Sequence, residues 1–336
     1  MFRILAGLLI VFCWNSHGIA CFMLPVTYSG TIRQRDHEAV IIHHAGREEL
    51  VLRINYEITG NTMPDNFAWV VTVPNEPDRY AIADERLFED MFKLSEKLSS
   101  QIRTNRKRGG GGGAGSFGGE GVELGKHVEV GPYDIQPVRG VGTHALEGLN
   151  AWLKANGFPT EDPIHMKYFV EKNFTFLCVK VAASPGEVSV QSGGVLPPLH
   201  LSLASPKPYF PLRFSSRQGV FNVNLHVLSR RKLDYSASHR VLQRINWSND
   251  KVARNYRLSK RKIPDSLRAV LAKSILKIDQ EVLFYNNIRG TDVNSNNTIA
   301  QWKADVFLNG VPRKYSAAHQ RSSIRVGYTG NENRVE

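Results

Sequence analysis

Cysteine is the residue type in this chain with the most distinct chemical options, and it occurs three times. Cys13 lies in an apolar N-terminal run, so the two cysteines that matter are Cys21 and Cys178. Cys21 could carry a lipid as the first residue of a lipoprotein or form a disulfide with Cys178. Both could instead stay unpaired, with Cys178 packed as a small apolar residue. A lipoprotein signal usually has Leu three residues before its cysteine. Gly18 stands there, which weighs against lipidation.

Histidines beside acidic residues raise the question of a metal site near residues 36–44. A zinc site needs three or four ligands that converge on one point. His43 and His44 are neighbours on a predicted strand, so they point to opposite faces and only one could join His37. We therefore interpret all three as surface or hairpin histidines and predict no metal site.

Other catalytic patterns fail on their spacing. The Gly-Lys pair at 125–126 follows a glycine-rich tract, as in a phosphate-binding loop. However, Glu120 stands where the first glycine is required and His127 where Ser or Thr is required. Glu48 and Glu49 are neighbours on a predicted strand and cannot form a facing carboxylate pair. The sequence therefore predicts no catalytic residues, no cofactor-binding residues and no cofactor.

Positive charge is concentrated in one segment of the chain. Residues 230–277 contain 14 basic and 3 acidic residues, which accounts for almost all of the net charge of +12. Such a block attracts polyanions, and a solvated basic face that keeps the protein soluble is the alternative interpretation. The partner is unknown, and its candidates are an anionic glycan, a lipid headgroup or an envelope protein. The residues that would form the patch are Arg230, Arg231, Lys232, Arg254, Arg257, Lys260, Arg261 and Lys262.

The first twenty residues have the pattern of a secretory signal peptide. Arg3 precedes an apolar run that ends at Trp14, and Gly18-Ile19-Ala20 places small residues three and one before a break. The run is shorter than the roughly 20 residues that span a bilayer, and no later stretch approaches that length. We expect cleavage after Ala20 and a periplasmic or secreted protein with no transmembrane segment.

The elements that would position these residues are mostly strands. Period-two alternation predicts a strand over residues 50–58, with residues 39–44 as its hairpin partner. Residues 67–73 are apolar on both faces, which is typical of a central strand. Further strands are predicted over 174–181, 199–203, 221–227 and 301–308. Helical spacing predicts helices from Asp84 to Leu98, from Thr143 to Gly157, from Pro163 to Glu171 and from Asp265 to Ile278.

These elements predict an α+β fold with a largely antiparallel sheet core and a few packed helices. A flexible glycine-rich loop is expected over residues 105–121, since glycine loses most backbone freedom on ordering. We expect three parts: a signal peptide over 1–20, a β-rich core domain over 21–229 and a basic region over 230–336. The last part is expected to be docked on the core, because its predicted helix has an apolar face.

Six runs, in this order and spacing, resemble the exported bacterial family called domain of unknown function 2330. The resemblance covers about residues 21–230 and weakens past Leu233. It implies an exported bacterial protein and a shared scaffold. The family has no established activity, so the resemblance supplies no catalytic residues. The runs that carry it are residues 34–46, 46–52, 67–74, 130–135, 152–158 and 174–181.

The leading functional hypothesis is a non-enzymatic envelope or secreted protein that acts in binding or architecture. It follows from the signal peptide, the strand-rich pattern and the lack of a convergent polar motif. A polyanion-binding module formed by residues 230–277 and an extracytoplasmic enzyme with an unrecognised pocket are the alternatives.

Overall fold

The computed structural model of the protein describes nine segments of the chain. The predicted signal peptide, the glycine-rich loop and the last 25 residues lie outside them. The described segments are residues 21–60, 64–101, 123–139, 143–182, 193–217, 219–244, 254–274, 283–293 and 305–311.

The first of two large sheets is antiparallel throughout its described pairs. Its central strand β4 lies between β1 and β9, as its two apolar faces predict. The order across this sheet is β1 (Phe22–Met23), β4 (Asn66–Val73), β9 (Thr175–Ala182), β8 (Tyr133–Arg139) and β6 (Glu123–Leu124), and β7 (Val128–Val130) also pairs with β8.

The second sheet is mixed, because β13 runs parallel to β2 while the other described pairs are antiparallel. Its order is β14 (Tyr256–Leu258), β15 (Leu283–Val293), β13 (Phe221–Ser229), β2 (Gly30–His44), β3 (Arg47–Gly60), β11 (Leu199–Ala204) and β5 (Arg79–Ile82), and β10 (Gly193–Val195) also pairs with β3. A further small sheet joins β12 (Tyr209–Phe210) to β16 (Val306–Phe307).

The long hairpin of β2 and β3 is the frame of the second sheet. Its two-residue turn is formed by Ala45 (φ 49°) and Gly46 (φ 79°). Positive φ at both central turn residues matches the twist of the flanking strands, which is why such turns are favoured in tight hairpins. This confirms the predicted hairpin and its turn.

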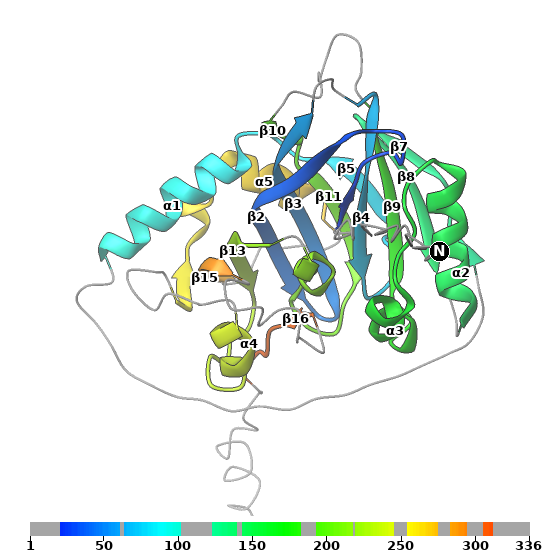
Figure 1. Ribbon diagram of the computed structural model, residues 1–336. Helices are drawn as coiled ribbons and strands as arrows, with labels where there is room; N and C mark the ends of the chain where they lie inside the picture. The colour runs from blue at the N-terminus through cyan, green and yellow to red at the C-terminus, as the bar shows by residue number, and fades with distance from the viewer. Residues whose placement is uncertain are drawn as a thin grey trace, which may run out of the picture.

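The helices cover the outer faces of the two sheets. Figure 1 shows α2 and α3 beside β8 and β9, and α1 on the opposite side of the molecule. Phe169 of α3 packs edge-on against Phe176 of β9. On the other side, α1 and α5 bury a separate apolar cluster against the second sheet. The helices are α1 (Leu87–Gln101), α2 (Thr143–Ala155), α3 (Pro163–Glu171), α4 (His239–Arg244) and α5 (Asp265–Ala272).

The observed elements confirm the predicted fold class, α+β with a largely antiparallel sheet core. One helix is shorter than predicted: α5 ends at Ala272, with Lys273 as its C-cap, and Ile275 and Ile278 lie outside the described residues. Of the last strand predicted over 301–308, residues 301–304 lie outside the described residues, and β16 covers Val306–Phe307. Within the described segments, no helix combines the length and apolarity needed to cross a membrane.

Strands from the basic region extend the second sheet. β15 pairs with β13 over nearly its whole length, and β14 pairs with β15 at the edge. The domain boundary predicted at residue 229 therefore falls at the end of β13, and the strands on both sides of it belong to one continuous sheet.

Candidate functional sites: an inter-sheet cavity and a basic surface

A β-bulge in β2 determines which polar side chains face the core. Gln34 pairs with Tyr56 while Asp36 pairs with Asn55, so Arg35 is the extra residue. Two residues three apart on a regular strand point to opposite faces. Because the bulge inserts one residue, Gln34 and His37 lie on the same face instead, the one that packs against the first sheet.

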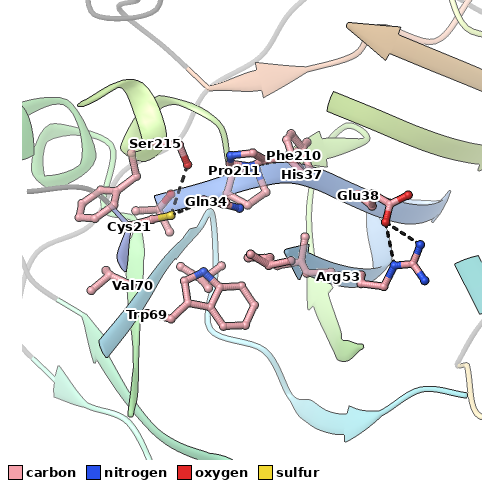
Figure 2. A pocket seen from close by; sticks show the side chains of 15 residues that line it. Cys21, Gln34, His37, Glu38, Arg53, Trp69, Val70, Phe210, Pro211 and Ser215 are labelled. Atoms are coloured by element: carbon pink, nitrogen blue, oxygen red, sulfur yellow. Dashed lines mark hydrogen bonds and ion pairs between the residues drawn. The ribbon is translucent and has the colours of Figure 1, made fainter. Parts of the chain in front are cut away.

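These two side chains line a small cavity together with Cys21. Its other walls come from β4 and from the loop and 3₁₀ helix η2 (Arg213–Arg217) that follow β12. The cavity offers about 20 Å³ to the centres of water-sized molecules. One such molecule needs roughly 10–15 Å³ by this measure, so the cavity holds a single small molecule or ion. Figure 2 shows Cys21, Gln34 and Ser215 gathered at one end.

The polar groups of the cavity are only partly satisfied. The Cys21 thiol donates to Gln34 Oε1 at 2.7 Å, and Ser215 Oγ donates to Cys21 Sγ at 3.5 Å. Gln34 Nε2 and His37 Nε2 are buried and have no hydrogen-bond partner among the described residues. The exposed fractions of Cys21, Gln34 and His37 are 4%, 2% and 4%. Since unsatisfied buried polar atoms are costly, two at one cavity make it a candidate polar binding site.

The imidazole of His37 is held between two aromatic rings. Its centroid lies 4.3 Å from that of Phe221 and 6.1 Å from that of Phe210. Burial lowers the pKa of His37 to about 3, so the ring is neutral at physiological pH. His37 therefore lies in the β2–β3 hairpin but not on the surface, because the bulge turns this side chain into the core.

The other two histidines of the predicted cluster lie elsewhere. His43 Nε2 lies 2.9 Å from the carbonyl oxygen of Ser205, and His44 Nε2 lies 3.0 Å from Arg230 Nη1. The three histidines therefore do not converge. No group of three or more His, Cys, Asp or Glu side chains in the described segments is arranged to hold a metal ion.

Cys21 and Cys178 flank the same residue from opposite sides. The carbonyl oxygen of Cys21 accepts from Val70 N at 2.7 Å, and Cys178 pairs with Val70 across β4 and β9. Two strand spacings separate their Cα atoms by about 10 Å, whereas a disulfide needs less than roughly 7 Å. The two cysteines are not bonded to each other, so the geometry does not support the disulfide alternative.

Lipidation of Cys21 meets a steric objection. Its thiol is nearly buried and faces a space for one small molecule. A diacylglyceryl group could not be accommodated there, so β1 would have to leave the sheet. Burial raises the pKa of Cys178, which is inert as a thiol packed in apolar surroundings.

Most of the predicted basic residues lie near the edge strand β14, whereas Arg230 lies beside His44 of β2. Arg257 of β14 pairs with Phe284 of β15, and Lys232 lies over the ring of Phe284 at 5.6 Å. Arg254 lies over Tyr235 at 5.1 Å. The 3₁₀ helix η3 (Lys260–Lys262) follows β14 directly and brings three further cations to the same edge.

Most of these cations face solvent. Six are exposed, while Arg230 and Arg254 are half-buried. Lys262 Nζ donates to Tyr256 Oη at 2.6 Å on the helix-covered face of β14. We call this set, with its aromatic neighbours, the β14 basic surface. Its exposed members are Arg231, Lys232, Arg257, Lys260, Arg261 and Lys262.

A buried polar cluster beneath α5 was missed by sequence reasoning. Glu49 accepts hydrogen bonds from Ser202 Oγ at 3.0 Å and lies 2.8 Å from His200 Nε2. Arg79 Nη2 lies 3.3 Å from the same carboxylate. The serine donates to the glutamate rather than to the histidine, so the cluster lacks the serine–histidine contact of a Ser-His-Asp/Glu triad. Glu48 points to the opposite face and accepts from Tyr209 N, as expected for neighbours on a strand.

The fold and sites define a two-sheet α+β protein with a buried thiol cavity and a basic sheet edge. The model of a family described as uncharacterized proteins conserved in bacteria, domain of unknown function 2330, matches residues 17–324. The chain therefore belongs to this family, which confirms the predicted resemblance and extends it beyond residue 230.

Other comparisons give weak likenesses. No curated protein matches the chain. Among solved structures, the crystal structure of baculovirus P35 matches with a TM-score of 0.39 and 12% identity, over 84% of this chain and 97% of that chain. The crystal structure of the caspase-8/P35 complex matches with a TM-score of 0.39 and 7% identity, over 83% of this chain and 97% of that chain. Scores at this level do not define a shared fold.

Proposed function

We propose that this protein is an exported, non-catalytic bacterial protein that binds an anionic envelope polysaccharide through the β14 basic surface. The supporting observation is a group of exposed cations that form no ion pair within the described residues. Exposed cations on one edge create a local positive potential that concentrates polyanions and speeds their association. The cations in this group are Arg231, Lys232, Arg257, Lys260 and Arg261.

Aromatic rings hold two cations of the β14 basic surface in place. Lys232 lies over Phe284, and Lys262 lies over Tyr256 at 5.1 Å. A ring that restrains a flexible cation lowers the conformational entropy lost when a ligand binds. The surface is thus partly organised before a polymer arrives.

The distribution of the cations favours a chain-like ligand over a flat membrane. Arg257 and Lys232 lie on one face of β14 beside Phe284, whereas Lys262 lies on the other face above Tyr256. A planar bilayer can approach only one face, but a flexible polysaccharide can follow the strand edge. The large apolar side chains that are exposed in the described residues all lie outside this surface.

The test measures retention on immobilised heparin and affinity for soluble heparin, as probes of an anionic polysaccharide. In the triple variant Lys232→Gln, Arg257→Gln, Arg261→Gln we expect earlier elution in salt and affinity lower by about 10- to 100-fold. The slope of log affinity against log salt should become shallower by about 2, since each lost contact to a flexible polyanion removes about 0.7.

A matched control removes the same charge elsewhere. Lys154→Gln, Lys167→Gln, Lys172→Gln alters exposed lysines of α2 and the α3 region, and we expect unchanged retention. Equal losses in both variants would contradict a local surface. Binding to phosphatidylglycerol vesicles without heparin binding would contradict the polysaccharide. Export is tested by the mass of the protein isolated from its host, which should correspond to a chain that begins at Cys21.

A further inference from the structure

The cavity between the sheets is lined by three polar side chains, and two of them have a buried nitrogen without a hydrogen-bond partner among the described residues. Cys21 brings a thiol, His37 brings a neutral imidazole whose Nε2 has no partner, and Gln34 brings an amide whose Nε2 has no partner. The basic surface lies at the β14 edge of the second sheet and does not include these residues. An inference from the cavity is therefore independent of polysaccharide binding.

We propose that this cavity is a Cu(I) site in which the Cys21 thiolate and His37 Nε2 are the ligands. Soft thiolate sulfur together with imidazole nitrogen selects soft transition-metal ions, whereas Ca²⁺ and Mg²⁺ prefer oxygen. Glu38, the carboxylate that also lines the cavity, is engaged by Arg53 at 2.6 Å. The donors that remain are the sulfur of Cys21 and the imidazole nitrogen of His37, which suit copper in its reduced state.

The number of donors and the space available favour Cu(I) over Zn²⁺. Zn²⁺ in structural sites takes four ligands, and in catalytic sites three ligands with a bound water. The cavity has room for one small particle, so an ion there cannot bring several water ligands. Cu(I) is stable with two ligands, which matches the Cys21 thiolate and the imidazole of His37.

The proton balance of binding is simple. The S–H bond of Cys21 breaks, an S–Cu bond forms and one proton is released to solvent, with no change in oxidation state. His37 binds through the lone pair of Nε2, which has no hydrogen-bond partner among the described residues. Ser215 Oγ donates to the sulfur at 3.5 Å and would stabilise the thiolate as an outer hydrogen-bond partner.

The amide of Gln34 adapts to the bound ion. In the structure its Oε1 accepts from the thiol, and its Nε2 has no partner among the described residues. Loss of the thiol proton removes that donor, so a rotation by half a turn becomes favourable. It directs Nε2 toward the thiolate, which gives this nitrogen an acceptor.

The test is an anaerobic titration of the full chain with Cu(I) in competition with the chromophoric chelator bicinchoninate. We expect one Cu(I) per protein. Affinity should fall by at least 100-fold in Cys21→Ser and in His37→Phe, a ring that fits between Phe210 and Phe221. Ser215→Ala should weaken binding by about 10- to 100-fold, as for outer partners of metal ligands. Cys178→Ala is the matched thiol control and should bind as the wild type does.

Copper-edge X-ray absorption of the wild-type complex tests the same site without relying on variants that fold. It should show one sulfur and one imidazole scatterer. Absence of stoichiometric Cu(I) binding, unchanged affinity in His37→Phe, or stoichiometric binding of Zn²⁺ in place of Cu(I) would each overturn the proposal. Heparin retention of the same variants should be unchanged, so failure here and failure of the polysaccharide proposal are distinguishable.

Discussion

The phenol of Tyr209 donates a 2.9 Å hydrogen bond to Asp305, which joins two segments that are 96 residues apart. The other carboxylate oxygen accepts from the backbone N–H groups of Leu212 and Arg213 at 3.0 and 2.5 Å. Asp305 is buried, and β16 begins at the next residue. One carboxylate therefore fixes both the loop after β12 and the C-terminal strand.

Replacement of Asp305 by Ala should lower the free energy of unfolding by about 3 kcal/mol or more. The substitution leaves the backbone N–H groups of Leu212 and Arg213 without their acceptor, and each such loss costs about 1–3 kcal/mol. Urea unfolding followed by circular dichroism measures the change. Asp265→Ala is the control, because its side chain is 96% exposed and should cost less than about 0.5 kcal/mol. Similar losses in both variants would contradict the role of Asp305.

The same carboxylate should give the stability a characteristic pH dependence. Burial raises the pKa of Asp305 from 3.8 to about 6, against the opposing effect of its hydrogen bonds. The folded state then binds the proton more tightly than the unfolded state. The contribution of Asp305 to the free energy of unfolding is fully present below pH 3.8 and is lost as the pH rises through 6. Each unit of pKa shift corresponds to 1.36 kcal/mol, so the span is about 3 kcal/mol.

The comparison that isolates this effect is wild type against Asp305→Asn between pH 4 and 7.5. Wild type should gain stability relative to the variant as the pH falls from 7 to 4. A difference in unfolding free energy that does not change with pH would rule out this titration.

The β2–β3 hairpin could be predicted because apolar residues alternate along it and its turn has a two-residue signature. The bulge could not be predicted from the sequence. Around Arg35 the chain is polar on every residue, so no apolar phase reveals that one residue is inserted. The faces of Gln34 and His37 depend on that insertion. The sequence contains every residue that lines the cavity, but it does not show that the bulge brings Gln34 and His37 to one face. The cavity therefore could not be predicted from the sequence.

The basic residues show the converse case. Their concentration in one segment is plain from composition, but their gathering around β14 depends on long-range pairing. The chain leaves β13 at Ser229 and returns as β14 and then β15, which bring Arg257 beside Phe284 and Lys232. Nor does any local signal connect Asp305 to Tyr209, since that contact forms only when β16 meets β12.

A buried histidine should make the protein sensitive to acid. His226 Nδ1 lies 2.7 Å from Tyr285 Oη. Burial, helped by the charges of Arg289 and Arg53, lowers the pKa of His226 to about 3. The contribution of His226 to the free energy of unfolding is present above pH 6.5, its pKa in the unfolded state. It is lost as the pH falls from 6.5 toward 3. The loss approaches about 1.4 kcal/mol per pH unit.

Substitution His226→Gln removes this titration. We expect the variant to be less stable than wild type at pH 7.5 and to lose less stability between pH 6.5 and 4.5, measured by urea unfolding. His239→Gln, at an exposed position of α4, should follow the wild-type curve. Parallel curves for wild type and His226→Gln would show that this histidine is not buried in its neutral form.

Both thiols should be protected in the folded protein. Cys178 is fully buried, and Cys21 is 4% exposed, so alkylation by iodoacetamide requires local or global opening. We expect negligible labelling of either residue under native conditions and complete labelling of both in denaturant without reductant. The second result follows because the Cα atoms are about 10 Å apart across β4. A mass two daltons low, with both cysteines unlabelled in denaturant, would reveal a disulfide.

The bulge gives the sharpest test of how sequence register controls the cavity. Deletion of Arg35 restores regular pairing, so either Gln34 or His37 must turn to the opposite face. We expect the deletion to cost about 2–4 kcal/mol of unfolding free energy, through lost packing and a displaced polar group. The substitution Arg35→Ala keeps the bulge and removes only an exposed ion pair with Glu57, which is worth about 0–1 kcal/mol. If deletion and substitution have equal effects, the inserted residue does not position His37.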